Sequence, residues 1–269
     1  MVFLQYFLPQ HLLSKLMFRF ARIENVWIKK TFTHWFINKN QVNLAEAEKD
    51  NISDYAHFND FFTRALKPDA RPISESPIIS PVDGVLSQAG PIEDSQILQA
   101  KGHHFSISQL LAVESVEKIE NGYFVTIYLA PKDYHRIHMP LNGKLISMRY
   151  VPGNLFSVNH KTVQKVNGVF ARNERLVCLF DTVFGRVAFV LVGAIFVGSM
   201  ETSWQGQITP PYGKEVKVFD YKEKEFELSK GDELGRFNMG STVIIILPET
   251  APALKLQSGQ ELKMGQSLI

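Results

Sequence analysis

Residues 239–247 read Met239-Gly240-Ser241-Thr242-Val243-Ile244-Ile245-Ile246-Leu247. The apolar run from position 243 is typical of a buried β-strand, and the glycine and serine before it are typical of a tight turn. The same stretch permits a second interpretation, because a serine between a glycine and a rigid strand is placed to attack its own peptide bond. The rest of the chain decides between a plain turn and a self-cleaving site.

Outward from this stretch, much of the chain alternates short β-rich runs with Gly, Pro and Asn. These runs lie at residues 84–88, 123–129, 144–151, 176–180, 187–192, 215–219 and 242–247. Closely spaced strands without long helices between them predict an α+β chain that is mainly antiparallel β, with a sandwich-like or barrel-like body. At 269 residues, size alone permits one large domain or two small ones. A further helix is predicted over residues 58–67, ended by the prolines that follow.

The N-terminal part differs from this body in charge and pattern. Residues 1–40 carry a net charge of plus five, whereas the other 229 residues carry minus three. Apolar positions within 12–23 fall on one arc of a helix with basic residues on another side, and a second helix is predicted over 27–36. Pro9 separates the first of these helices from a short element before it. We therefore predict an amphipathic membrane-associating region over residues 1–50; nucleic acid as partner, or packing of these faces on the body, are the alternatives.

Composition also bears on location. The longest uncharged apolar run, from Val187 to Met200, has 14 residues, fewer than the roughly 20 that a membrane-spanning helix needs. The N-terminus lacks the pattern of a signal peptide. Cys178 is the one cysteine and lies in an apolar run, so we expect a buried thiol that forms no disulfide, which suits a reducing compartment. The expected location is the cytoplasm, on or near a membrane.

Polar residues with catalytic potential lie at the ends of the predicted strands. Asp83 lies between Pro81 and Gly84, and His135 and His138 follow the strand that ends near residue 129. Alone, an Asp-Gly pair is commonly a turn, and two histidines three residues apart are as consistent with a structural or metal-binding role as with catalysis. The remaining histidines have no Cys or carboxylate spacing that completes a metal site, so no metal is predicted.

Six motifs tie these residues together. They are Phe58-Asn-Asp-Phe-Phe-Thr-Arg-Ala-Leu-Lys-Pro-Asp-Ala-Arg-Pro72, Pro81-Val-Asp-Gly84, Asp133-Tyr-His-Arg-Ile-His-Met-Pro140, Pro152-Gly-Asn-Leu-Phe-Ser-Val-Asn159, Phe170-Ala-Arg-Asn-Glu-Arg175 and Gly240-Ser-Thr242. Their order resembles that of bacterial phosphatidylserine decarboxylase proenzymes, a pyruvoyl-dependent family whose histidine and Gly-Ser-Thr motifs lie at the active site. Met239 stands where the family usually has Leu, an exchange that conserves volume and polarity.

The resemblance implies a self-cleavage reaction. Ser241 would attack the carbonyl of Gly240, with His138 as general base and Asp83 orienting its imidazole. The resulting ester would eliminate, and hydrolysis would leave a pyruvoyl group at position 241 as a covalent cofactor, with no metal required. The catalytic body, residues 51–269, would then be divided between a β chain, residues 1–240, and an α chain, residues 241–269. These chains form a heterodimer, and a dimer of such heterodimers is left open.

The resemblance also implies the activity that follows. The pyruvoyl group at position 241 would form a Schiff base with phosphatidylserine, accept the electrons released with CO2, and so yield phosphatidylethanolamine. His135 would donate the proton to the substrate carbon. Phe156 and Ser157 are candidates for the headgroup pocket, with a purely structural turn as the alternative. The expected location becomes peripheral, on the cytoplasmic face of the inner membrane, where the enzyme serves phospholipid biosynthesis.

Two other functions remain as alternatives. A serine hydrolase could use Asp83, His138 and Ser241 on a separate substrate, but the chain lacks Gly-x-Ser-x-Gly, and a strand follows the serine where a hydrolase has a helix. A non-catalytic, membrane-bound β-sandwich module is the other alternative. Cleavage of the purified chain with release of CO2 would indicate the decarboxylase. Labelling of Ser241 by a fluorophosphonate probe on an uncleaved chain would favour the hydrolase, and absence of both cleavage and decarboxylation would favour the module.

Overall fold

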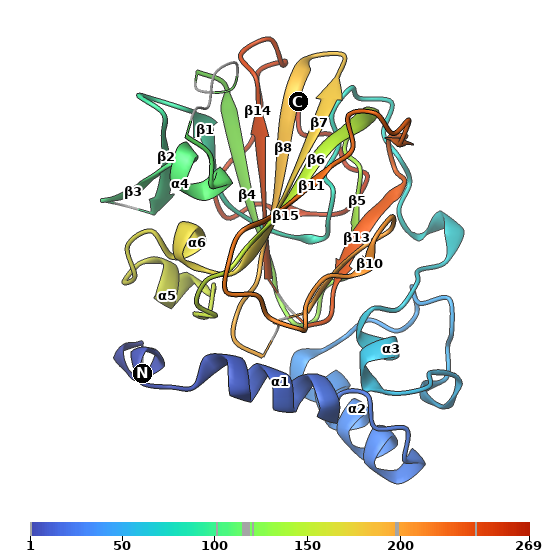
Figure 1. The fold of residues 1–269 in the computed structure, drawn as a ribbon. Coiled ribbons are helices and arrows are strands. Elements are labelled where there is room, and N and C mark those ends of the chain that lie inside the picture. The colour runs from blue at the N-terminus through green and yellow to red at the C-terminus, as the bar shows by residue number, and fades with distance from the viewer. Residues whose placement is uncertain (1, 101, 115–118, 120, 197–198, 240) are drawn as a thin grey trace.

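A computed structural model of the chain describes residues 2–100, 102–114, 119, 121–196, 199–239 and 241–269. The body is built from β-strands, and the N-terminal helices lie together at one end of it (Figure 1). The chain is thus mainly antiparallel sheet with few helices, as the sequence predicted. Cys178 is fully buried in the body, also as predicted.

Within the described residues, nine strands form the largest sheet, all paired antiparallel. Their order is β11-β6-β7-β8-β14-β4-β1-β15, and β12 also pairs with β6. Seven of them correspond to the seven predicted strands. The bounds are β1 Gly84–Pro91, β4 Tyr123–Leu129, β6 Gly143–Val151, β7 Arg175–Thr182, β8 Gly185–Val192, β11 Lys217–Asp220, β12 Glu227–Leu228, β14 Ser241–Leu247 and β15 Glu261–Leu262.

Two smaller sheets complete the strand content of the described chain. A four-stranded sheet has the order β10-β9-β13-β5, and β2 and β3 form a separate hairpin. Side chains of the four-stranded sheet, such as Ile137 and Phe237, join the same apolar core as Ile244 of the large sheet, so two layers share one core. The bounds are β2 Gln96–Ala100, β3 His103–Ser106, β5 Arg136–His138, β9 Met200–Thr202, β10 Gly206–Gln207 and β13 Glu233–Phe237.

Strand β14 lies inside the large sheet, between β8 and β4. Ser241 pairs with Leu129 of β4, and Thr242 pairs with Val192 of β8. Every residue of β14 is buried, because its β-branched side chains face packed layers on both sides of the sheet. The stretch that opened the sequence analysis therefore forms an interior strand.

The helices are short except near the N-terminus. Their bounds are η1 Phe3–Tyr6, α1 Gln10–Phe20, α2 Val26–Asn40, η2 Ile52–Asp54, α3 Phe58–Phe62, η3 Pro68–Ala70, α4 Ile107–Leu111, α5 His160–Val163 and α6 Val169–Arg172. A short element, a bend at Pro9 and two helices were predicted and are present. No helix in the described ranges combines the length and apolar character needed to cross a bilayer.

The helix predicted over residues 58–67 was wrong in its second half. Helix α3 ends at Phe62, where the Thr63 hydroxyl donates a hydrogen bond back to the Asn59 carbonyl. Beyond it, Leu66 pairs with Ala47 in an isolated β-bridge. Backbone pairing with the segment after α2 therefore replaces the last helical turns, and this long-range contact left no local signal in the sequence.

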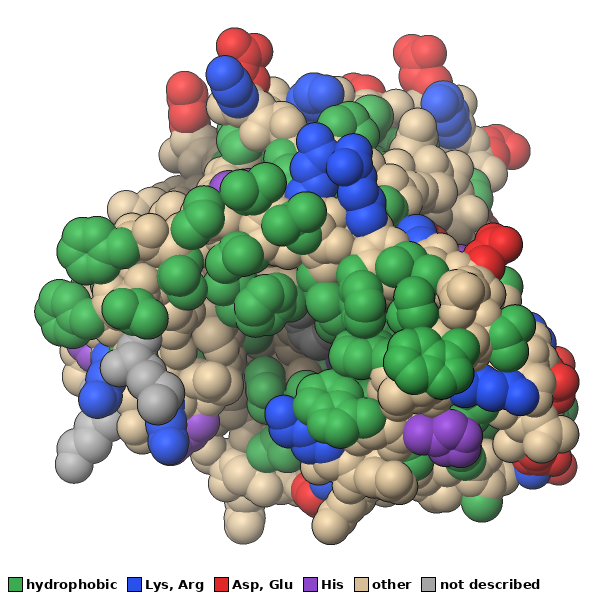
Figure 2. Space-filling view, turned by 90° about the horizontal axis from the view of Figure 1, so that it is seen from below, with side chains coloured by type: hydrophobic (Ala, Val, Ile, Leu, Met, Phe, Trp, Pro, Cys, Tyr) green, Lys and Arg blue, Asp and Glu red, His purple; other side chains and the backbone are tan. Residues whose placement is uncertain are grey.

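The N-terminal segment contacts the body through its polar side chains. Gln10 and Ser14 of α1 are buried, and their side-chain oxygens accept hydrogen bonds from the N–H groups of Leu155 and Phe196, at 2.6 and 3.0 Å. Figure 2 shows hydrophobic side chains gathered on the outer face of the helices, with a hollow in its middle. We call this the apolar face; its exposed members include Phe3, Leu4, Phe7, Leu12, Leu16, Phe20, Val26, Trp27 and Trp35.

Candidate active site

Ser241 is the first residue of β14 and is completely buried. Its Oγ has no hydrogen-bond partner among the described residues. An unpaired buried hydroxyl costs about 1–3 kcal/mol, so native proteins rarely keep one without a reason. The position combines a rigid backbone with an unengaged nucleophile.

The residues before Ser241 are held firmly on one side. Asn238 is buried; its Nδ2 donates to Ser199 Oγ at 2.8 Å and to Glu201 Oε1 at 2.7 Å, and its Oδ1 accepts from Asn59 Nδ2 at 2.8 Å. Met239 has a φ of 108°, a region that side-chain-bearing residues rarely occupy. Gly240, the predicted cleavage residue, lies outside the described residues. Backbone strain is therefore localised one residue before it.

His135 is buried against α3, with its ring centroid 4.1 Å from that of Phe62. Its Nδ1 lies 2.8 Å from the Asp133 carbonyl, which can only accept, so Nδ1 carries the proton. Its Nε2 is buried without a partner in the described chain. Burial lowers the pKa of His135 to about 3, which makes the ring a neutral imidazole with an available Nε2 lone pair at pH 7.

His138 has both ring nitrogens engaged. Its Nδ1 lies 2.7 Å from the Gly231 carbonyl, and its Nε2 lies 2.9 Å from the Tyr134 hydroxyl. Because the carbonyl accepts, Nδ1 is protonated and Nε2 accepts the tyrosine O–H. Burial lowers the pKa of His138 as well, against the opposing effect of the Gly231 hydrogen bond. His138 therefore also stands in the form of a base.

Asp83 is buried and satisfied on both carboxylate oxygens. Oδ1 accepts from Arg71 Nε at 2.8 Å and from the Met264 N–H at 2.9 Å, and Oδ2 accepts from Arg71 Nη2 at 2.5 Å and from Lys263 Nζ at 3.2 Å. Burial would raise the pKa of Asp83, but Arg71, the Met264 N–H and Lys263 outweigh it and lower the pKa. Gly84 beside it has to be glycine, because a Cβ there would lie 2.5 Å from the Tyr128 carbonyl oxygen.

The predicted triad is only partly assembled. The His138 N–H group donates to the Pro81 carbonyl at 2.8 Å, so β5 runs beside the turn that carries Asp83. No hydrogen bond between the Asp83 carboxylate and the His138 imidazole occurs among the described residues, since Arg71 and Gly231 occupy the two groups instead. A triad in the predicted form requires one of these partners to be exchanged.

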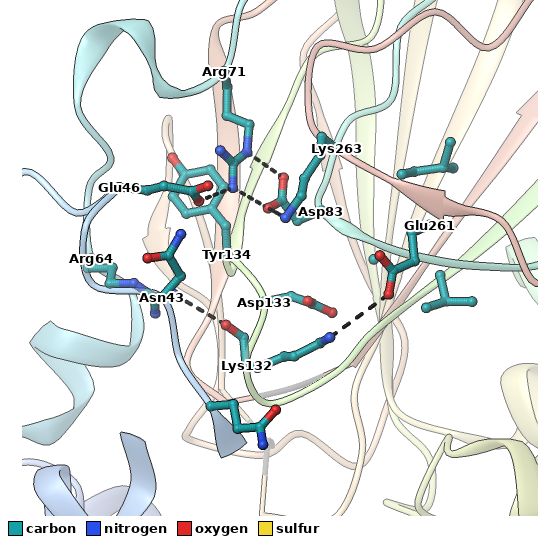
Figure 3. A pocket seen from close by; sticks show the side chains of 14 residues that line it. Asn43, Glu46, Arg64, Arg71, Asp83, Lys132, Asp133, Tyr134, Glu261 and Lys263 are labelled. Atoms are coloured by element: carbon teal, nitrogen blue, oxygen red, sulfur yellow. Dashed lines mark hydrogen bonds and ion pairs between the residues drawn. The ribbon is translucent and has the colours of Figure 1, made fainter. Parts of the chain in front are cut away.

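A charged cavity of about 160 Å³ opens beside Asp83 (Figure 3). In Figure 3, Arg71 lies between Glu46 and Asp83, and Lys263 approaches the same carboxylate from the other side. The cavity is thus bounded by the segment after α2, the start of β1, the loop before His135 and the C-terminal tail. The lining residues are Gln41, Asn43, Glu46, Arg64, Arg71, Asp83, Gly84, Val85, Lys132, Asp133, Tyr134, Glu261, Leu262 and Lys263.

Phe156 and Ser157 lie away from this cavity and contact the N-terminal segment. Phe156 is buried with its ring centroid 4.9 Å from that of Tyr6, and the Ser157 N–H donates to Gln5 Oε1 at 2.8 Å. Asn173, from the motif at 170–175, bonds both the N–H and the carbonyl of Phe156. These contacts describe a structural brace, and the predicted headgroup contact of Phe156 and Ser157 stays a prediction.

Several residues of the site had not been singled out from the sequence. Arg71 and Arg64 lie within the motif at 58–72, which was a usable signal, and Asn238 directly precedes the cleavage motif. Lys263 gave no signal, because a lone lysine in a polar tail is ordinary. Among the described residues, no three His, Cys, Asp or Glu side chains are grouped so as to hold a metal ion.

Comparison with known proteins identifies the family. The family model described as phosphatidylserine decarboxylase matches residues 58–269, and a second, described as PSD, matches residues 1–39. A phosphatidylserine decarboxylase proenzyme from Methylobacillus flagellatus is 51% identical over 258 residues, covering 95% of this chain and 92% of the relative. Proenzymes of the same name from Pseudomonas putida F1 and Saccharophagus degradans are 52% and 50% identical, each covering 98% of this chain and 95% of the relative. The chain belongs to the phosphatidylserine decarboxylase family.

Proposed function

We infer that this protein is a phosphatidylserine decarboxylase, made as a proenzyme that converts phosphatidylserine to phosphatidylethanolamine and CO2. The observation that carries this conclusion is Ser241, a buried serine whose Oγ has no hydrogen-bond partner in the described part of the chain, and which stands in the family's Gly-Ser-Thr motif at the start of an interior strand. Family membership over nearly the whole chain supports the same activity.

Maturation begins at the Ser241 hydroxyl. Its Oγ attacks the carbonyl carbon of Gly240, the C–N bond to Ser241 breaks, and the Oγ proton passes through a base to the released amine. The strained φ of Met239 supports this step, because strain near a peptide bond is relieved when that bond breaks. Elimination of the ester gives dehydroalanine at position 241, and its hydrolysis releases ammonia and leaves the pyruvoyl group.

The two histidines divide the proton transfers. His138 Nε2 is unprotonated, as a base for Ser241 must be, and Asp83 is kept ionised by Arg71. Asp83 would take the orienting role once His138 Nδ1 exchanges the Gly231 carbonyl for its carboxylate. His135 Nε2 is kept unprotonated by its low pKa, so it first takes up a proton that the substrate ammonium group releases and then gives it to the substrate carbon. The buried, unpartnered Nε2 supports this assignment.

The residues present fit a pyruvoyl group, because Ser241 supplies a serine from which such a group forms, and it is buried at the start of an interior strand. When formed, the group supplies an electron sink for the loss of CO2. The chain's own residues bind the substrate, exclude water and move the protons.

The test is the mass of the purified protein together with its activity. Wild-type protein should separate on denaturing electrophoresis into fragments matching residues 1–240 and 241–269, the smaller one blocked at its N-terminus. It should also release CO2 from carboxyl-labelled phosphatidylserine. Full-length wild-type protein that is nonetheless active, or cleaved protein that releases no CO2, would contradict the proposed function.

The apolar face supports peripheral association with a membrane. Helix α1 buries polar side chains against the body and turns Leu12 and Leu16 outward, at 56% and 53% exposed. Phe7, which precedes α1, is 83% exposed, and α2 adds Trp27 at 75%. A water-facing helix has the opposite arrangement, whereas Phe and Trp on the outside of a helix suit a lipid interface. Lys15 and Arg19 are exposed nearby and suit anionic headgroups.

Vesicle sedimentation tests this association. Replacing Phe7 and Trp27 together with Ser should weaken binding to anionic vesicles at least tenfold, about 1.4 kcal/mol, and leave self-cleavage intact. Val183→Ser, at an exposed residue of the β7–β8 turn, is the matched control and should bind as wild type does. Equal binding by all three proteins would refute a role for the apolar face.

A further inference from the structure

Arg64 carries a buried charge without a counter-ion. Arg64 lies just after α3 in the sequence, and the residue is only 4% exposed. Among the described residues its one hydrogen bond runs from Nη2 to the Lys132 carbonyl, at a long 3.3 Å, and its Nε is buried with no partner. No Asp or Glu in the described chain lies within the 4.0 Å of an ion pair.

The other cations of the cavity have partners. Arg71 is paired with Glu46 and Asp83, and Lys263 with Asp83. Lys132 is exposed and lies 3.9 Å from Glu261. Removing a guanidinium from water without an anion costs several kcal/mol, a cost that an anionic ligand would offset. The lining has four carboxylates for its four cations, and the Arg64 guanidinium lies 5.4 Å from the Phe61 ring centroid, so the need for an anion is local to Arg64. Figure 3 shows Arg64 at the edge of the cavity, on the side opposite Lys263.

This cavity is continuous with the loop that carries His135. Arg64 bonds the carbonyl of Lys132, and the next carbonyl, that of Asp133, accepts from His135 Nδ1 at 2.8 Å. On the other side, Phe62, two residues before Arg64, packs on the His135 ring. A ligand held by Arg64 therefore lies against the loop that places His135.

We propose that Arg64 binds the phosphodiester group of the phospholipid substrate in this cavity. The inference rests on the proposed function, because phosphatidylserine enters only through it. At about 160 Å³ the cavity accommodates one such anionic group and leaves the acyl chains outside. The guanidinium fork matches two phosphate oxygens at once, which makes arginine better suited than lysine to this contact.

The substrate carboxylate is the other anion that could pair with Arg64, and catalysis argues against it. The carboxylate loses its charge as neutral CO2 departs, so a cation on it would stabilise the ground state more than the transition state. The phosphodiester keeps its charge throughout the reaction. Binding energy from that group holds the lipid in place without raising the barrier.

Kinetics with two variants test the proposal. Arg64→Gln and Arg64→Lys are first checked for cleavage into the two fragments, and CO2 release is then measured against phosphatidylserine in mixed micelles. We expect Arg64→Gln to raise KM at least tenfold, about 1.4 kcal/mol, with kcat within about threefold of wild type. The KM of Arg64→Lys should lie between those of the wild type and Arg64→Gln. Arg186→Gln, which removes an exposed arginine paired with Asp181, is the control and should match wild type.

Ligand binding gives a readout that does not depend on turnover. Glycerophosphoserine should raise the Tm of the wild-type protein, and free serine at the same concentration should not. Arg64→Lys should show at most half of that rise, and Arg64→Gln none. Inorganic phosphate is a separate arm: a rise with phosphate but none with glycerophosphoserine would assign the site to free phosphate and overturn the lipid assignment.

Further results would also overturn the proposal. These are an unchanged KM in Arg64→Gln, a loss confined to kcat, or equal stabilisation of wild type and Arg64→Lys by glycerophosphoserine. Failure of both variants to cleave would make Arg64 a residue of folding or maturation. Absence of CO2 release by the wild type itself would instead refute the proposed function, so the two failures are distinguishable.

Discussion

Buried polar atoms at Ser241 and at Asp83 differ in whether they have hydrogen-bond partners among the described residues. The hydroxyls of Ser241 and Thr242 and the Nε2 of His135 are buried without partners in the described chain. At Asp83, both carboxylate oxygens accept two hydrogen bonds each. The candidate site residues thus differ in how fully their buried polar atoms are hydrogen-bonded.

We interpret the groups without partners as reactive and the fully paired carboxylate as an anchor of the fold. Unpaired buried groups cost stability, and native proteins keep them where chemistry requires a free lone pair or hydroxyl. A fully paired carboxylate instead fixes the segments that meet at it, here the turn before β1, the segment after η3 and the C-terminal tail. Four experiments test this contrast, from the largest expected effect to the smallest.

Ser241→Ala should abolish cleavage and leave one chain on denaturing electrophoresis, because the nucleophile is gone. The variant should also be more stable than an uncleaved chain that keeps the serine, by about 1 kcal/mol, since an unsatisfied hydroxyl is removed. Thr126→Val is the matched control, because Thr126 Oγ1 is also buried without a partner in the described chain. It should gain similar stability and cleave normally; loss of stability in both variants would contradict the contrast.

Asp83→Asn should destabilise the fold by about 3 kcal/mol, because it leaves the buried Arg71 with the partly exposed Glu46 as its one carboxylate partner. Urea unfolding in the Ser241→Ala background measures this effect separately from cleavage. In the otherwise wild-type chain the same substitution should slow self-cleavage strongly. A stability change below about 1 kcal/mol would show that Asp83 is not an anchor.

The pH dependence of the uncleaved protein's stability should carry a contribution from His135. Its folded pKa of about 3 is lower than in the unfolded chain, so the unfolded state binds its proton first. This contribution is complete above the unfolded pKa and falls by roughly 1.4 kcal/mol per pH unit between about pH 6 and pH 4, whereas Glu174, whose pKa burial raises to about 7, contributes with the opposite sign. His138 contributes with the same sign as His135, because its pKa is also lowered.

Urea unfolding of Ser241→Ala at pH 7, 6 and 5 measures this slope, with Ser241→Ala/His135→Gln as its control. The double variant should differ from Ser241→Ala by the contribution of His135, because the other titrating groups are the same in both proteins. Parallel slopes for the two proteins would mean that His135 is not held neutral by burial.

Lys263→Gln should cost less than about 1 kcal/mol, because its side chain is half-exposed and its pairing with Asp83 is screened by water. Arg71→Lys should cost more, since a lysine cannot replace the two-point contact with the carboxylate. Thermal unfolding of both variants ranks the two cations. A larger loss in Lys263→Gln would place the anchor in the tail and not in Arg71.

Much of the fold was predictable because the strands carry local signals. The run from Val243 to Leu247 is apolar and β-branched, and it forms a strand whatever surrounds it. The order of strands in the sheet was not predictable, since pairing of β14 with β4 and β8 depends on contacts at least 50 residues away. The predicted helix was wrong at residues 64–67 for the same reason, because these residues form backbone pairs with the segment at 46–48.

The site was predictable as far as its motifs reach. Asp83, His135, His138 and Ser241 each stand in a recognisable local pattern. Their hydrogen-bond partners cannot be recognised in the sequence, because groups such as the Gly231 carbonyl and the Met264 N–H belong to the backbone, which every residue has. Sequence patterns therefore name reactive side chains and leave open the contacts that hold them.

The interior position of β14 bears on how the protein refolds. Cleavage before Ser241, as proposed, leaves a 29-residue fragment, residues 241–269, that contributes a strand hydrogen-bonded on both sides within the large sheet. In the precursor this strand joins the sheet as part of the same chain. In the unfolded mature protein the separate fragment first has to bind the other chain from solution. Refolding of mature protein should thus slow on dilution, while Ser241→Ala should refold at a rate independent of concentration. The chain would then assemble its sheet easily only once, before it cuts itself.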